Sequence, residues 1–178
     1  RVVMIVSAIF LLVYWYLSMH FGVPGQELTM LGNAGIELDK LVLGESHMYH
    51  GEGVAFDPEG ILSTLPAIVN VLIGFRVGKF IQEKGKTYEG LMLLMMWGAG
   101  FIFLGFMWNY QFPINKKLWS SSFVMLTVGL DMVIIGTIIY RIELQRQLQF
   151  SGFFETFGKN PLVIYLFSEI LVSVLNMV

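Results

Sequence analysis

The 178-residue sequence contains no cysteine, which excludes disulfides, zinc–thiolate sites and cysteine nucleophiles. Charged residues are also scarce, at 13%, whereas soluble domains carry about a quarter. The net charge of −2 offers no basic surface for a polyanion, so we expect no nucleic-acid partner. His47 and His50 lack a third ligand at a recognisable spacing, and we therefore predict no metal site.

Hydrophobic residues, in contrast, make up 56% of the chain, and the mean hydropathy is +0.69. A bilayer core needs roughly 20 consecutive apolar residues in a helix. Five segments approach this length as solid apolar blocks, without the alternation of barrel strands. We therefore predict an all-α, polytopic transmembrane helical bundle that forms one domain over residues 1–178. The predicted spans are residues 2–20, 60–81, 88–108, 118–141 and 161–178.

Lysine and arginine concentrate at one end of these spans, which predicts the orientation of the chain in the membrane. Lys79, Lys84 and Lys86 surround the connection between the second and third spans, and Arg141, Arg146 and Lys159 follow the fourth. The short turn 82–87 is therefore placed in the cytoplasm. The connections 21–59 and 109–117 then lie on the extracytoplasmic side. Residues 142–159 mix phenylalanine with Gln and Arg, which fits either an amphipathic interfacial stretch or an ordinary loop.

The connection 21–59 is far longer than most loops, which indicates a functional or a disordered segment. It holds seven acidic residues, and its apolar residues are dense enough to predict an ordered lid folded onto the helices. Asp57 fits the N-cap of the next helix, with Pro58 at the first helical position and Glu59 in the first turn. The same carboxylates can orient a polar substrate and accept a proton from an amine. His47 is either a surface histidine or a general base.

Arg76 and Asp131 are charged residues inside predicted spans, where an isolated charge is costly. Their depths, about 24 and 20 Å from the outer side at 1.5 Å per residue, predict an ion pair or a polar cavity. Arg76 can instead extend to the cytoplasmic interface. Glu169 lies near the middle of the last span and is expected to face the bundle interior. The spacing of Gly74 and Gly78 predicts close helix packing.

Several strings of residues occur together in the order that is typical of one known family, and they cover nearly the whole chain. These strings are Gly32–Gly35, Leu43–Tyr49, Phe56–Thr64, Phe112–Ser120 and Gly158–Pro161, followed by Tyr165 and Glu169. The ordered set resembles the transmembrane N-acetyltransferases of the heparan-α-glucosaminide type and their bacterial relatives. Bacterial members are also described as N-acetylglucosamine-related transporters.

The resemblance implies transfer of an acetyl group from cytoplasmic acetyl-CoA to a glucosamine-type amine outside a bacterial inner membrane. The residues that it marks as candidates for catalysis are Asp57, Glu59 and His47. Those that it marks for substrate binding are Asn115, Lys116, Asn160 and Glu169. The candidates for attracting the CoA phosphates are Lys79, Lys84 and Lys86. Positive-inside topology explains these lysines equally well, and a helix-start role explains Asn115 and Lys116.

The chain departs from the family pattern in two places. It lacks the amino-terminal motif that holds the proposed catalytic histidine, and Phe167-Ser168 stands where animal members carry Gly-His. We therefore expect a piece of a longer membrane protein, inactive without further amino-terminal helices. The expected partners are the lipid bilayer, an amino sugar, those missing helices and a second copy in a homodimer.

Two other classes of function remain open from the residues alone. One is a sugar transporter, in which the second, fourth and fifth spans line the pathway and Asp131 and Glu169 act as coupling groups. The other is a binding protein without turnover. The absence of two inverted halves in the sequence disfavours a transporter built from repeats.

Overall fold

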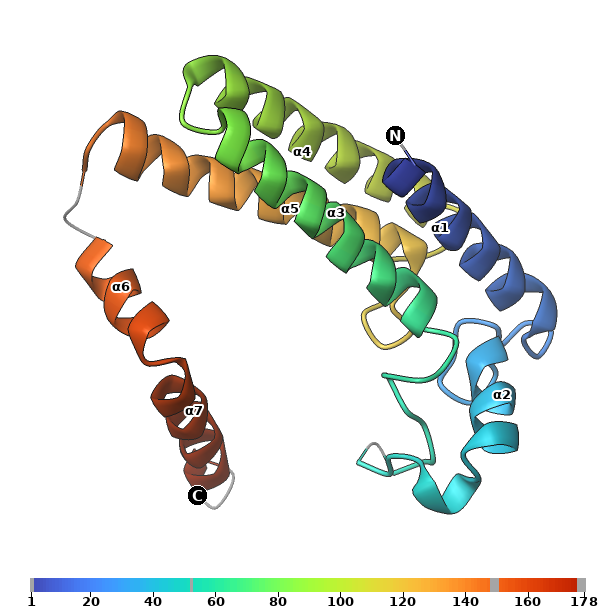
Figure 1. Ribbon diagram of the computed structural model, residues 1–178. Coiled ribbons are helices and arrows are strands. Elements are labelled where there is room, and N and C mark those ends of the chain that lie inside the picture. Colours follow the sequence, from blue (N-terminus) through green and yellow to red (C-terminus); the bar gives the residue numbers. More distant parts are fainter. Residues whose placement is uncertain (1, 52, 148–150, 176–178) are drawn as a thin grey trace. The chain divides into compact units, whose positions relative to one another are not determined.

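The computed structural model describes residues 2–51, 53–147 and 151–175 (Figure 1). Regular structure in these ranges is helical, which confirms the predicted all-α class. The chain divides into two compact units, Arg1–Gly136 and Thr137–Val178. Four positions or segments lie outside the described residues, including part of the predicted amphipathic stretch and the end of the fifth predicted span: Arg1, Glu52, 148–150 and 176–178.

Among the described residues, four helices are long and apolar enough to cross a membrane, as predicted for a multi-pass membrane protein. They are α1 (Val2–Phe21), α3 (Thr64–Lys84), α4 (Tyr88–Asn109) and α5 (Ser121–Ile139), which continues to Leu144. In the first unit α1 packs against α3 (Figure 1). The aliphatic side chains buried between the helices form one cluster: Leu11, Val69, Ile73, Leu94, Val124, Met125, Val128 and Met132.

Two glycines bring α4 and α5 into backbone contact. A Cβ atom at Gly129 would lie 2.7 Å from the carbonyl oxygen of Gly98, and one at Gly98 would lie 2.9 Å from that of Gly129. The predicted close packing at Gly74 and Gly78 is wrong, because no heavy atom of the described residues lies within 4 Å of a Cβ at either position. Both glycines lie on a face of α3 that has no close neighbour among the described residues.

The long connection after α1 is folded, as predicted. It contains α2 (Ala34–Val42) and the short 3-10 helix η1 (Glu45–His47). Asn33 caps α2, since its Oδ1 accepts from the backbone N–H groups of Gly35 and Ile36 at 2.9 and 3.1 Å. Within the connection, a small buried cluster is formed by Ile36, Met48 and Ala55.

Two helices begin later than predicted. α3 begins at Thr64 rather than at residue 60, with Ser63 as its N-cap. α5 begins at Ser121 rather than at residue 118, because Trp119 has φ 55° and so leaves the right-handed helical region. In both cases the residues before the helix form a turn that lines a cavity.

The second unit continues α5 as a π-helical turn, η2 (Tyr140–Leu144), and adds two helices. α6 (Ser151–Lys159) makes part of the stretch 142–159 helical. α7 (Pro161–Leu175) begins where the fifth span was predicted to begin, and it is helical through the described part of that span.

Candidate functional site

The connection that leads into α3 ends in a tight corner, residues 57–63. Asp57 Oδ1 accepts a hydrogen bond from the Glu59 N–H at 3.0 Å, and the Asp57 carbonyl accepts one from the Gly60 N–H at 3.2 Å. The Ser63 hydroxyl donates to the Gly60 carbonyl at 2.8 Å. The predicted N-cap role of Asp57 is therefore wrong, because its carboxylate closes this turn before the helix begins.

Asp39, on α2, is buried against the corner, and it is not among the predicted site residues. Its side chain is 3% exposed, and its Oδ1 accepts from the Ile61 N–H at 2.8 Å. Burial raises the pKa of the Asp39 carboxyl; the nearby charge of Asp57 adds to this rise, and the bond from Ile61 opposes it. A signal was present in the sequence, since Asp39 lies three residues after Ile36 and so shares its buried helix face.

A small cavity lies between the carboxylates of Asp39 and Asp57 and the end of α1. Its polar lining comes from α1, the connection and the turn before α5: Tyr14, Asn33, Asp39, Asp57, Ser63 and Lys117. Its volume of about 20 Å³ accommodates roughly one water molecule and no sugar. Lys117 lines this cavity, whereas the predicted Lys116 does not.

A larger pocket of about 390 Å³ lies beside it, on the other side of Pro58 and Ser63, which line both. Its polar lining residues are Glu59, Ser63 and Thr64, and its apolar wall includes Trp119. The Trp119 indole Nε1 is buried and has no hydrogen-bond partner among the described residues. The pocket thus combines a carboxylate, hydroxyls and an aromatic ring beside an apolar floor, which is the usual composition of a site for a small polar molecule.

Asn115 shapes the turn before α5 and does not line this pocket. Its Oδ1 accepts from the N–H groups of Lys117 and Leu118 at 2.9 and 3.3 Å. Its Nδ2 donates to the Leu28 carbonyl at 3.4 Å. Lys116 is exposed and lines neither cavity at the corner. The geometry therefore favours the structural role that the sequence analysis left open for these two residues.

His47 is not brought to the corner. Its Nδ1 lies 3.1 Å from the Leu43 carbonyl and 3.3 Å from the Ser46 hydroxyl, within the turn that holds η1. The side chain is exposed and lines neither corner cavity. Of the three predicted catalytic residues, the structure brings together Asp57 and Glu59 only.

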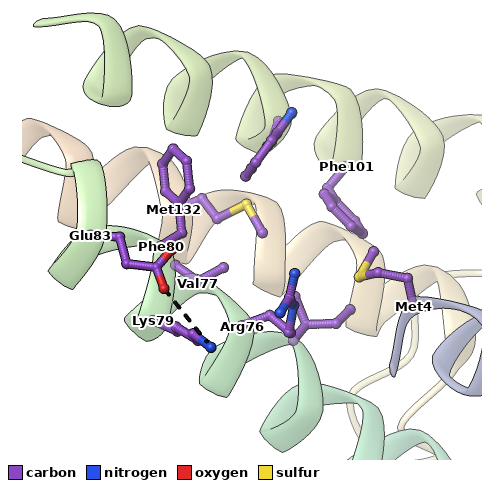
Figure 2. A pocket seen from close by; sticks show the side chains of 10 residues that line it. Met4, Arg76, Val77, Lys79, Phe80, Glu83, Phe101 and Met132 are labelled. Carbon is purple, nitrogen blue, oxygen red and sulfur yellow. Dashed lines mark ion pairs between the residues drawn. The ribbon is translucent and has the colours of Figure 1, made fainter. Parts of the chain in front are cut away.

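A third cavity, of about 300 Å³, lies between α1, α3, α4 and α5 (Figure 2). Its lining is mostly apolar and includes Met4, Phe101 and Met132. Lys79 and Glu83 of α3 contribute the charged edge, with 3.9 Å between Nζ and Oε1 (Figure 2). Of the three predicted CoA-binding lysines, only Lys79 lines this cavity; Lys84 is the last residue of α3, and Lys86 lies in the turn after it.

The predicted ion pair between Arg76 and Asp131 is not formed. No salt bridge joins these two residues in the described part of the chain, and both side chains are exposed. The reason is helical phase: α5 turns Val128 and Met132 inward, and each residue step rotates the side chain by about 100°. Arg76 lines the third cavity, and Asp131 does not.

The Glu59 pocket and the third cavity lie on opposite faces of α3. The pocket uses the helix face that carries Thr64, Ala67, Ile68 and Val71. The cavity uses Ile73, Arg76, Val77 and Phe80, which a period of 3.6 residues places about half a turn away. A molecule in the third cavity is therefore separated from Glu59 by the body of α3.

The two remaining candidates belong to the second unit. Asn160 lies between α6 and α7, and its Nδ2 donates to the Thr156 carbonyl at 3.0 Å. Its own carbonyl accepts from the Ile164 N–H at 3.1 Å. Glu169 lies on α7, with a side chain that is exposed within the second unit.

Two curated proteins are similar to this chain. It is 30% identical over 162 residues to human heparan-alpha-glucosaminide N-acetyltransferase, a match that covers 82% of the chain and 24% of that protein. It is 31% identical over 156 residues to the mouse protein of the same name, covering 79% of the chain and 24% of the relative. The chain therefore spans far less than the length of these relatives. No family model matches the chain. The two matches confirm the predicted resemblance to the heparan-α-glucosaminide N-acetyltransferase family.

Proposed function

We propose that the full-length protein is a membrane-embedded acetyltransferase that moves an acetyl group from acetyl-CoA to a glucosamine-type amine. The similarity to two enzymes that bear an N-acetyltransferase name supports this activity. We further propose that the enzyme lies in a bacterial inner membrane, with the corner 57–63 on the extracytoplasmic side and the Lys84–Lys86 turn in the cytoplasm.

The pocket beside Glu59 is the observation that carries the proposal. In it the acceptor amine contacts the Glu59 carboxylate, the sugar hydroxyls bond to Ser63 and Thr64, and the apolar ring face packs on Trp119. Its volume of about 390 Å³ is in the range of ligand pockets, unlike the cavity between Asp39 and Asp57. Asp57 supports the acceptor indirectly, because its carboxylate holds the Glu59 backbone N–H.

The reaction requires a neutral amine, which attacks the thioester carbonyl carbon. A carbon–nitrogen bond forms as the carbon–sulfur bond breaks, the amine proton passes to a base, and CoA leaves as the thiolate, which becomes the thiol when the base returns that proton. We assign Glu59 the role of holding the amine and accepting this proton. Lys79, Lys84 and Lys86, at the other end of α3, attract the CoA phosphates from the cytoplasmic side.

The proposal predicts that Glu59→Gln in the full-length protein lowers kcat/KM for the acceptor by roughly a hundredfold, because the amide cannot take a proton. The assay uses sealed vesicles with radiolabelled acetyl-CoA inside and glucosamine outside, and measures labelled N-acetylglucosamine in the outer solution. Glu37→Gln is the matched control, since Glu37 is an exposed carboxylate on α2 that lines neither corner cavity.

Two outcomes of this assay would contradict the proposal. Uptake of unmodified N-acetylglucosamine without acetyl transfer would identify a transporter instead. Equal kinetics for wild type and Glu59→Gln, with transfer intact, would leave Glu59 outside the reaction.

A further inference from the structure

The side chain of Asp39 makes a contact that links two separate parts of the connection. It lies on the buried face of α2, and its Oδ1 accepts from the N–H of Ile61, 22 residues further along the chain. A carboxylate that is 3% exposed is costly unless donors compensate it. The same bond satisfies the Ile61 N–H, which precedes α3 and has no helical carbonyl partner.

The second oxygen of the same carboxylate occupies the space beside Gly60. A Cβ atom at Gly60 would lie closer than 3.0 Å to Asp39 Oδ2, and the other atoms of the Asp39 carboxylate would crowd it as well. Only glycine therefore fits here without displacing its neighbours. Asp39 therefore contacts two successive residues of the corner, through a hydrogen bond to Ile61 and through tight packing on Gly60.

We propose that Asp39 is a positioning residue for the acceptor pocket, which rests on the function proposed above. Asp39 does not line that pocket, whereas Glu59 does, directly before the two residues that Asp39 holds. The turn bond from Glu59 N–H to Asp57 fixes the corner from one side, and the Asp39 contact fixes it from α2. Together they fix where the Glu59 carboxylate points relative to Trp119.

The test is a double-mutant cycle in the full-length enzyme, read as acceptor KM, donor KM and kcat. Asp39→Ala removes the acceptor of the Ile61 bond and is expected to raise the acceptor KM by roughly tenfold, with the donor KM unchanged. Asp39→Asn keeps an oxygen for the Ile61 N–H and is expected to restore most of the wild-type acceptor KM. Glu37→Ala, an exposed change on the same helix, is the control.

Gly60→Ala provides the independent arm, because its methyl group collides with the Asp39 carboxylate. It is expected to raise the acceptor KM as Asp39→Ala does. In the double variant Asp39→Ala/Gly60→Ala the collision is gone, so the KM should be no higher than in either single variant. The same non-additivity should appear in the melting temperatures.

The outcomes separate this inference from the proposed function. A wild-type protein that transfers no acetyl group would overturn the function, and additive losses of melting temperature would then overturn the Asp39–Gly60 contact itself. An active wild type with an unchanged acceptor KM in Asp39→Ala, or with additive effects of the two substitutions, would overturn the positioning role alone.

Discussion

Trp119 carries two unfavourable features in a single residue. Its φ of 55° lies in the left-handed region, which costs an L-residue roughly 1–2 kcal/mol. Its buried indole N–H has no partner among the described residues, which costs about 1–3 kcal/mol more. Costs of this kind persist where the surrounding structure enforces them, and they cluster at ligand sites. Here the indole lines the proposed acceptor pocket.

Trp119→Phe keeps an aromatic ring and removes only the N–H donor. We expect the melting temperature of the full-length protein to stay the same or to rise, because no protein hydrogen bond is lost. The acceptor KM should rise by roughly three- to tenfold if the indole donates to a sugar hydroxyl. Calorimetry measures the melting temperature, and steady-state kinetics measure the acceptor KM. An unchanged acceptor KM would show that the N–H does not take part in recognising the sugar. Trp15→Phe is the control, because the Trp15 indole N–H is also buried without a partner among the described residues.

The sequence could identify the corner but not its construction. Asp57 and Glu59 were predicted as site residues from local helix-start chemistry, and the structure does place Glu59 in a pocket. The spacing from Ile36 could place Asp39 on the buried face of α2, but its contact with Ile61 joins residues 22 positions apart, which no local pattern reveals. Lys116 was predicted as a site residue instead of Lys117, because the sequence does not show the turn around Asn115. This turn decides that Lys117 lines the cavity.

At the scale of helices, apolar length predicted α1 and α4 to within a residue at each end. The starts of α3 and α5 were misplaced, because the preceding residues are apolar or helix-compatible but are held in turns by tertiary contacts. Side-chain bonds such as that from Ser122 Oγ to the Phe112 carbonyl, at 2.5 Å, hold the turn before α5. The sequence also did not reveal how each helix is rotated about its own axis. For this reason the predicted pairing of Arg76 with Asp131 was wrong.

The contact between α4 and α5 gives a prediction at this scale. Gly129→Ala should destabilise the protein by about 1–3 kcal/mol, because the new methyl group meets the Gly98 carbonyl and the Ile102 amide. Gly74→Ala is the matched control: no neighbour lies within 4 Å, so alanine should stabilise α3 by roughly 0.5–1 kcal/mol. Denaturation of both variants in detergent measures the difference. Equal effects would show that the two helices do not rely on this backbone contact.

At the scale of the whole molecule, the acidic connection and the lysine-rich turn flank α3 at opposite ends, and they must therefore face opposite sides of a membrane that α3 crosses. Which side is which follows from the positive-inside rule. The lack of cysteine in this chain makes the prediction easy to test by labelling.

A single cysteine at Ser46 should react with an impermeant maleimide added outside intact cells, because this residue is exposed in the connection. A cysteine at Gln82, in the exposed end of α3, should react only after the cells are opened. The two variants control for each other in a full-length protein whose other cysteines have been replaced. The reverse labelling pattern would place the acceptor pocket in the cytoplasm.

The hydrogen bonds that attach α1 to the start of α5 also impose an order on biogenesis. The Tyr14 hydroxyl donates to the Leu118 carbonyl, 104 residues later, and the Ser121 hydroxyl donates back to the Leu11 carbonyl, 110 residues earlier. The ribosome has therefore synthesised α1, the acidic connection, α3 and α4 before these partners exist. Trp119, which completes the proposed acceptor pocket, is synthesised with the same segment. Glu59 consequently leaves the translation machinery without its pocket, and the pocket closes only when the start of α5 reaches the membrane.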